Sequence, residues 1–188
     1  MRKCGYSVTV AFATMVGLTA SSAQTGPYKL PSASMNPTFI PGAIVNVVKY
    51  AAGAQPTPGD VIAFRVPSDM KTVFLFRVVG IGGDKVQVVK GALHINGDAI
   101  KREQIADFAD TDDGKPISVK QWRETLPGGA SYNVIHLFPI GPFDNTALVT
   151  IPAGHVFVLG DSRHNARDSR DPSVGTIPLA NVVGRVSK

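Results

Sequence analysis

Short apolar runs separated by turn residues dominate the chain after its first two dozen residues. Four of these runs have the length and the Val, Ile and Phe content of β-strands: residues 44–48, 61–66, 72–81 and 155–159. Pro58-Gly59-Asp60 and Gly82-Gly83-Asp84 are typical turn sequences beside them. No long stretch after the amino terminus has the spacing of an amphipathic helix. The pattern predicts a mostly β fold with antiparallel strands.

A second group of short runs follows. Lys90-Gly91 lies between the apolar runs 86–89 and 93–95, which predicts a β-hairpin. Residues 101–129 are polar and show no clear period of two, so we expect them to be irregular. Residues 85–152 are therefore predicted to form an inserted β-rich lobe.

The amino terminus has the features of an export segment. Met1-Arg2-Lys3 is basic, an apolar run extends from Tyr6 to Leu18, and Ser21-Ser22-Ala23 is a small-x-small cleavage sequence. The run is shorter than the ~20 apolar residues that usually span a bilayer. Residues 1–23 are predicted to be a signal peptide or a membrane anchor. Residues 24–188 would then be extracytoplasmic, either secreted into the periplasm or anchored to the inner membrane.

Charge and composition exclude several other classes. The net charge of +5 is spread along the chain without a basic cluster, which argues against a nucleic-acid partner. The single cysteine, Cys4, cannot form an intramolecular disulfide, and the four histidines are scattered. No metal site and no cofactor are predicted.

Four separated segments carry the chemistry. They are Pro31–Thr38, Pro58–Phe64, Arg77–Val86 and Gly160–Arg170. In this order and spacing they resemble the sequence boxes of the type I signal peptidases, and the resemblance covers most of residues 28–188. It implies a signal-peptidase-like β domain, with no cofactor. The implied activity is that of a serine endopeptidase, which removes signal peptides from exported preproteins at the membrane surface.

The resemblance assigns roles to individual residues. Ser34 matches the nucleophile, and the Ser32 hydroxyl with the Ser34 backbone N–H matches the pair that stabilises the oxyanion. The positions matching the substrate pocket are Leu30, Pro31, Met35, Phe39 and Phe74. The positions matching scaffold residues are Arg77, Asp84, Asp161, Asp168 and Arg170.

The catalytic lysine of that family is absent. A serine hydroxyl needs a neighbouring base, and the family uses a lysine whose pKa is lowered by burial. Phe76 stands at the lysine position, and a phenyl ring cannot accept a proton. Lys71 lies five residues earlier, an odd number along a strand, so it is expected to face the other way. Ala166 replaces the serine that orients the lysine in the family, a second change that agrees with the first.

Several readings stay open at this stage. The first is an active signal peptidase-like enzyme, which requires a base that the sequence does not reveal. Within the family we favour a protein that is catalytically impaired by Phe76, with the ring narrowing the substrate pocket. A second is a non-catalytic binding or accessory protein that recognises extended apolar or signal-like segments. A third is a specialised peptidase that acts on one exported substrate. His164 is expected to be a solvated loop residue rather than a substitute base.

Overall fold

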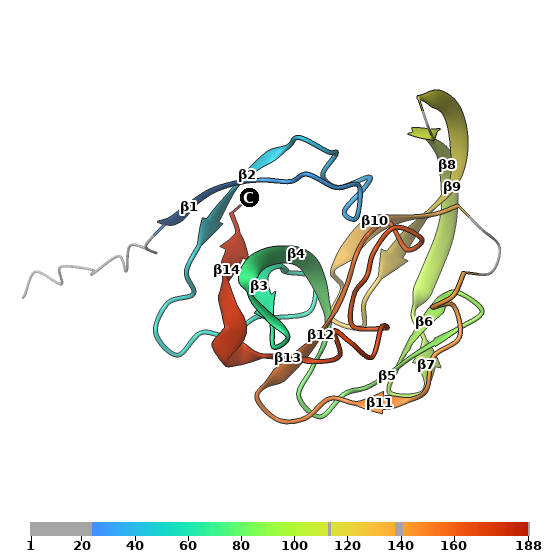
Figure 1. Cartoon of the computed structure of the whole chain (residues 1–188). Coiled ribbons are helices and arrows are strands. Elements are labelled where there is room, and N and C mark those ends of the chain that lie inside the picture. The colour runs from blue at the N-terminus through green and yellow to red at the C-terminus, as the bar shows by residue number, and fades with distance from the viewer. Residues whose placement is uncertain (1–23, 113, 138–140, 188) are drawn as a thin grey trace, which may run out of the picture.

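Three antiparallel sheets make up the fold of the described residues. The computed structural model describes residues 24–112, 114–137 and 141–187. The largest sheet has seven strands in the order β1-β2-β14-β3-β4-β12-β13 (Figure 1). In that order their bounds are Gln24–Lys29, Ile44–Val48, Val182–Val186, Val61–Val66, Asp69–Ile81, His155–Leu159 and Ile177–Pro178. The predicted mostly β, antiparallel class is confirmed.

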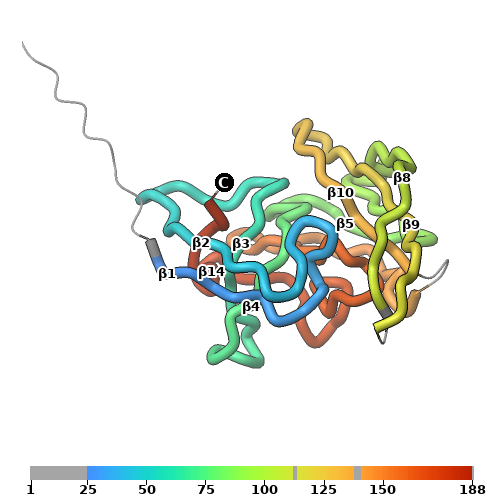
Figure 2. Tube along the Cα trace, turned by 90° about the horizontal axis from the view of Figure 1, so that it is seen from above, coloured from blue at the N-terminus to red at the C-terminus, as the bar shows by residue number. Residues whose placement is uncertain are grey.

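Two smaller sheets are formed by the middle of the chain. One has the order β11-β5-β6-β7, with bounds Val149–Thr150, Lys85–Val89, Ala92–Ile95 and Asp98–Ala99. The other has the order β10-β9-β8, with bounds Ser131–His136, Lys115–Thr125 and Lys101–Asp112. In both views its strands lie on the opposite side of the molecule from β1 and β2 (Figures 1 and 2). All these strands lie in sequence within the predicted lobe 85–152, whose boundaries stay a prediction.

The expected irregularity of residues 101–129 is wrong. Residues in this range form the long hairpin of β8 and β9, which extends away from the body of the molecule (Figure 1). Only Val119 and Glu124 of β9 are buried, so this strand shows no run of alternating apolar residues. A register shift between Ile105 and Phe108 of β8 interrupts the period further. Pairing of the backbones, rather than burial of a side-chain face, holds these strands together.

The predicted hairpin around Lys90-Gly91 is confirmed. Strand β5 pairs with β6 through Val89 and Ala92, so the turn contains two residues. Lys90 and Gly91 both have positive φ angles, 48° and 76°. Two central residues with positive φ match the right-handed twist of the flanking strands.

Strands β4 and β12 separate two hydrophobic clusters. Phe76 and Val78 of β4 pack in the first cluster, together with Ile62 and Phe64 of β3. Val79 of β4, one residue further on, packs in the second cluster with residues of the smaller sheets. Successive side chains of a strand point to opposite faces, so one strand contributes to both cores. The face that carries Phe76 is therefore fixed by the packing of the first core.

The export segment predicted for residues 1–23 lies outside the described residues. In the described part of the chain, no helix has the length and apolar character needed to cross a bilayer. The one helical element there is a short 3-10 turn, Leu179–Asn181.

Close approach of β14 to β2 generates a stability prediction. A Cβ atom on Gly184 would lie 2.4 Å from the Val48 carbonyl oxygen and 2.9 Å from Val47 Cγ1. Gly184→Ala must push the two strands apart, and we expect it to lower the free energy of unfolding by about 1–3 kcal/mol. Gly128→Ala is the matched control, because nothing lies within 4 Å of its Cβ position. Urea unfolding followed by circular dichroism measures both variants; equal midpoints would contradict the prediction.

Candidate functional site

The loop between β1 and β2 carries the predicted nucleophile. A hydrogen bond of 2.9 Å from Leu30 N to the Ala43 carbonyl joins the two ends of this loop. Inside the loop, Asn36 N donates to the Ala33 carbonyl at 3.0 Å. Met35, 1% exposed, anchors the loop in the first core. Ser34 is therefore held between a hydrogen-bonded turn and a buried side chain.

A second loop, residues 160–170 after β12, meets the first one. Ser162 N donates to the Ser34 carbonyl at 3.0 Å, which joins the two backbones. The Ser34 hydroxyl donates to the Asn165 carbonyl at 3.3 Å and lies 3.1 Å from the Ser32 hydroxyl. The two predicted site serines are thus together, and neither of these two partners of the Ser34 hydroxyl is a base.

Phe76 and Ala166 lie close to the Ser34 backbone. Both are buried, at 5% and 4% exposure, in the first hydrophobic cluster. A Cβ atom on Gly160 would lie 2.3 Å from Ala166 Cβ, 2.7 Å from the Ser34 carbonyl oxygen and 3.3 Å from Phe76 Cε1. The phenyl ring and the methyl group therefore meet at Gly160, directly behind the nucleophile loop. Nothing larger than hydrogen fits at Gly160 itself.

A cavity of about 260 Å³ opens next to the two serines. Its walls include Ser32 and Ser34 from the nucleophile loop and the apolar segment of β4 that ends at Phe76. The residues that line it are Tyr28, Lys29, Leu30, Pro31, Ser32, Ser34, Met35, Thr72, Val73, Phe74, Leu75, Phe76, Asn165 and Arg167. The cavity is thus formed by β1, β4 and the two loops.

Four of the five residues expected in the substrate pocket line this cavity, and one lies elsewhere. Leu30, Pro31, Met35 and Phe74 line the cavity. Phe39 does not line this cavity. A turn closed by a hydrogen bond of 2.9 Å from Phe39 N to the Met35 carbonyl places Phe39 at a second cavity, beside Arg77. Its assignment to the cavity next to Ser34 is therefore corrected.

The cavity wall also contains two cationic residues that were not predicted from the sequence, Lys29 and Arg167. Neither belongs to a motif with a recognised spacing, so no pattern in the sequence singled them out. Lys71, by contrast, is exposed and is not among the lining residues.

Arg77 and Asp161 form a buried ion pair under the nucleophile loop. Arg77 Nε and Nη2 donate to the two carboxylate oxygens of Asp161 at 2.9 and 2.6 Å. Thr38, in the nucleophile loop, donates its hydroxyl to the same carboxylate. Arg77 Nη1 donates to the Gly59 carbonyl at 2.8 Å. The pair thus ties β4, the nucleophile loop and the 160–170 loop together.

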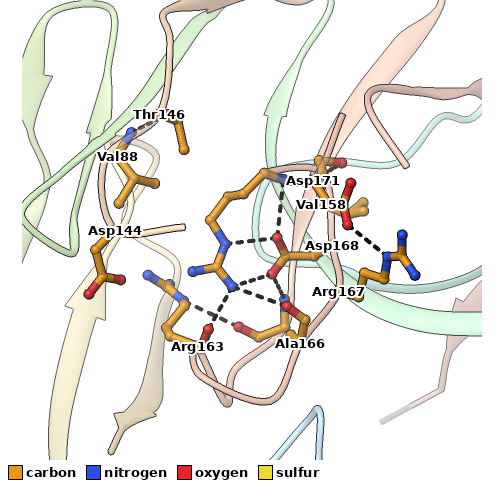
Figure 3. Close-up of polar contacts among 12 residues, drawn as sticks. Val88, Asp144, Thr146, Val158, Arg163, Ala166, Arg167, Asp168 and Asp171 are labelled. Carbon is orange, nitrogen blue, oxygen red and sulfur yellow. Dashed lines mark hydrogen bonds and ion pairs between the residues drawn. The ribbon is translucent and has the colours of Figure 1, made fainter. Parts of the chain in front are cut away.

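Asp168 and Arg170 form a second buried pair inside the 160–170 loop. Arg170 Nε and Nη2 donate to Asp168 at 2.8 and 2.9 Å. Asp168 also accepts from Gly160 N at 3.0 Å, and Arg170 Nη2 donates to the Arg163 carbonyl at 2.8 Å. Figure 3 shows Asp168 at the centre of these contacts, with Ala166 and Arg163 beside it. The pair closes the loop on itself.

Arg163 and Glu124 form a third pair, and neither residue was assigned a role from the sequence. Arg163 Nη1 donates to Glu124 at 3.2 Å, and its Nη2 contacts the other carboxylate oxygen. Both side chains are almost fully buried. Burial opposes the charge on Arg163, but Glu124 together with the other neighbouring groups outweighs it, and the pKa of Arg163 lies above its ordinary value. This pair attaches β9 to the 160–170 loop.

Asp84 lies apart from the cavity. Its carboxylate accepts from Ile81 N at 3.0 Å and from Asn96 Nδ2 at 2.9 Å. These contacts brace the turn between β4 and β5, so Asp84 supports the smaller sheets.

His164 is half-buried and differs from the expected solvated residue. Its Nδ1 accepts a hydrogen bond from Leu137 N at 3.1 Å, and its ring packs edge-on against His136 with centroids 6.3 Å apart. Burial, with a smaller effect of His136, lowers the pKa of His164. His164 is not among the residues that line the cavity.

Comparison with known proteins identifies the family. The family model described as signal peptidase, peptidase S26, matches residues 3–188. The chain belongs to the type I signal peptidase family. Members of this family act on the signal peptides of exported preproteins, and they are membrane-associated with extracytoplasmic catalytic domains. Membership therefore supports a function in signal-peptide removal.

Several proteins similar to this chain are signal peptidases I. The signal peptidases I of Rickettsia typhi and Rickettsia prowazekii are each 28% identical to the chain, covering 85% of it and 69% of their own length. A signal peptidase I of known structure, from Enterococcus faecalis V583, is 21% identical with a TM-score of 0.43. The match covers 71% of this chain and 98% of that one.

The buried pair of Arg163 and Glu124 generates a second prediction. Glu124→Gln leaves the Arg163 charge buried without a carboxylate, and we expect a loss of about 3–5 kcal/mol in the free energy of unfolding. Glu103→Gln on the neighbouring strand β8 is the matched control, because Glu103 is exposed. Urea denaturation of the two variants provides the comparison. A Glu124→Gln midpoint equal to that of Glu103→Gln would show that the ion pair does not hold the loop.

Proposed function

We propose that the protein is a signal peptidase I-like serine endopeptidase whose catalysis is impaired by the loss of its general base. The observation that carries the proposal is the packing of Phe76 and Ala166 behind Ser34. In this proposal Ser34 is the nucleophile and Ser32 supports the oxyanion. Phe76 and Ala166 occupy the positions of the lysine and of its orienting serine.

The chemistry of the Ser34 surroundings supports impairment. The hydroxyl contacts the Ser32 hydroxyl and the Asn165 carbonyl, and neither accepts a proton from serine near neutral pH. Loss of a positioned general base slows a reaction by roughly 10²–10⁴-fold. Where the nucleophile and the base act as one unit, the loss can approach ~10⁶-fold. Any remaining hydrolysis would rest on oxyanion stabilisation and binding alone.

Packing supports the view that the two changes belong together. Phe76 lies in contact with the Phe64 ring, with centroids 5.9 Å apart, in the first hydrophobic cluster. A serine hydroxyl at position 166 would be buried beside this apolar surface without its lysine partner, which is unfavourable. The methyl group of Ala166 avoids that cost. Phe76 thus adds to the packing of the core and forms part of the cavity wall beside Ser34.

A second function is favoured by the cavity itself. Although the base is missing, the cavity next to Ser34 stays open and is lined mainly by apolar side chains. A protein of this kind would bind extended apolar or signal-like segments without cleaving them. In either case the proposed place of action is extracytoplasmic, in the periplasm and at the membrane surface.

Restoring the base tests the proposal. Purified wild type and the double variant Phe76→Lys with Ala166→Ser are incubated with a preprotein, and the products are separated by electrophoresis. We expect no detectable cleavage by the wild type. We expect cleavage by the double variant, because the second substitution supplies a hydroxyl partner for the lysine that the first one introduces.

The control removes the nucleophile. Ser34→Ala, introduced into both the wild type and the double variant, separates cleavage by this site from cleavage by a contaminant. Preprotein processing by the wild type that disappears in Ser34→Ala would contradict the proposal, since it requires a base other than the missing lysine.

A further inference from the structure

The end of strand β10 pairs with the 160–170 loop, and the last contact of this pairing is made by a histidine ring. Ile135 donates its N–H to one carbonyl of the loop and accepts from Arg163 N, both at 2.9 Å. These two contacts are those of a parallel bridge. The next donor on this side of the strand, Leu137 N, binds the ring nitrogen Nδ1 of His164 at 3.1 Å. One contact between strand and loop therefore depends on a side chain that titrates.

The contact with Leu137 fixes the protonation state of the ring. A regular parallel pair would give Leu137 N the Arg163 carbonyl as its acceptor. Here that carbonyl accepts from Arg170 Nη2 at 2.8 Å, and the His164 ring binds Leu137 N instead. A backbone N–H can only donate, so Nδ1 carries no proton while this contact exists. The neutral ring then has its hydrogen on Nε2, which lies 3.2 Å from the side-chain amide of Asn165.

Asn165 connects this ring to Ser34. The Asn165 carbonyl accepts the Ser34 hydroxyl at 3.3 Å, while its side-chain amide lies against His164 Nε2. Asn165 also follows His164 directly in the chain. A displacement of the ring therefore moves the residue that holds the Ser34 hydroxyl.

The groups packed around His164 favour its neutral form. His136 of β10 packs edge-on against the ring and is itself bonded to the buried Asp144 carboxylate at 3.0 Å. Burial has the largest effect and His136 adds to it, so the pKa of His164 lies below its ordinary value of 6.5. Asp110 of β8 and the Ile135 carbonyl oppose this shift only in part.

The cations of the same loop are held by carboxylates. Arg163 pairs with Glu124, and Arg167 pairs with Asp171. Because the pKa of His164 is lowered by folding, the unfolded chain binds the proton more tightly than the folded chain does. The folded state therefore loses stability as the pH falls below about 6.5, and the contacts of the neutral ring are the ones at risk.

We infer that protonation of His164 detaches the 160–170 loop from Leu137 and loosens the hold of Asn165 on the Ser34 hydroxyl. Solvent supplies the proton to Nδ1, since the ring is half-buried. The new N–H then faces the N–H of Leu137, and two donors cannot share this contact. The attraction of Asp110 stabilises the cation that forms. His164 is thus a positioning residue that makes the surroundings of Ser34 depend on pH, whether or not the chain cleaves peptides.

NMR spectroscopy of the isotope-labelled full chain tests the inference. The His164 ring signals and the backbone amides of Leu137, Asn165 and Ser34 are followed from about pH 7.5 to about pH 4.5. We expect all three amides to shift with the midpoint of the ring, below 6.5. Protection of the Leu137 amide from hydrogen exchange, corrected for the intrinsic effect of pH, should fall by about threefold to tenfold, the range for one net hydrogen bond.

His164→Asn removes the titration but keeps an acceptor. The side-chain oxygen of Asn can accept from Leu137 N at every pH in this range. We expect the pH-dependent shifts of Leu137, Asn165 and Ser34 to disappear in this variant. His94→Asn is the matched control, because it removes a histidine on β6, in another sheet, and it should leave those shifts unchanged.

Each failure has a distinct meaning. A Leu137 amide that does not follow the titration of the wild-type ring overturns the inference without any variant. A response of Leu137 that does not reach Asn165 and Ser34 overturns the link to the nucleophile. Shifts that persist in His164→Asn overturn the inference as well, since another group such as His136 would then be responsible. None of these results bears on the loss of catalysis, which the cleavage experiment tests separately.

Discussion

The arrangement of the site depends on the anchoring of the 160–170 loop by three arginine–carboxylate pairs. Arg77 holds its beginning through Asp161, and Arg170 closes it through Asp168. Arg163 attaches it to β9 through Glu124. Each arginine also donates to a backbone carbonyl, which satisfies part of its hydrogen-bonding capacity in a buried setting. In this arrangement the loop meets the Ser34 segment at Ser162 and Asn165.

This anchoring is compatible with an aromatic ring at position 76. The ion pairs lie on the polar side of the loop, whereas Phe76 and Ala166 belong to the apolar cluster on its other side. Alternation along β4 separates the two roles, since Phe76 faces the first core and its neighbour Arg77 faces the polar side. An aromatic ring at position 76 extends the core without disturbing the pairs. The fold of the family can therefore hold a phenyl ring at the position that the resemblance assigns to the lysine.

Sequence pattern by itself determined the β class and the strands around Val47, Phe64 and Val158, because the strand period is local. It also singled out Ser34, Phe76 and Ala166 as candidate site positions, because family motifs are local. Tertiary structure alone decided the rest. The β8–β9 hairpin has few buried side chains and leaves no alternating pattern. Phe39 turns away from the cavity through a backbone contact, and Arg167 reaches the cavity because of how its loop is anchored. Such placements depend on contacts between segments far apart in the chain, which no local pattern records.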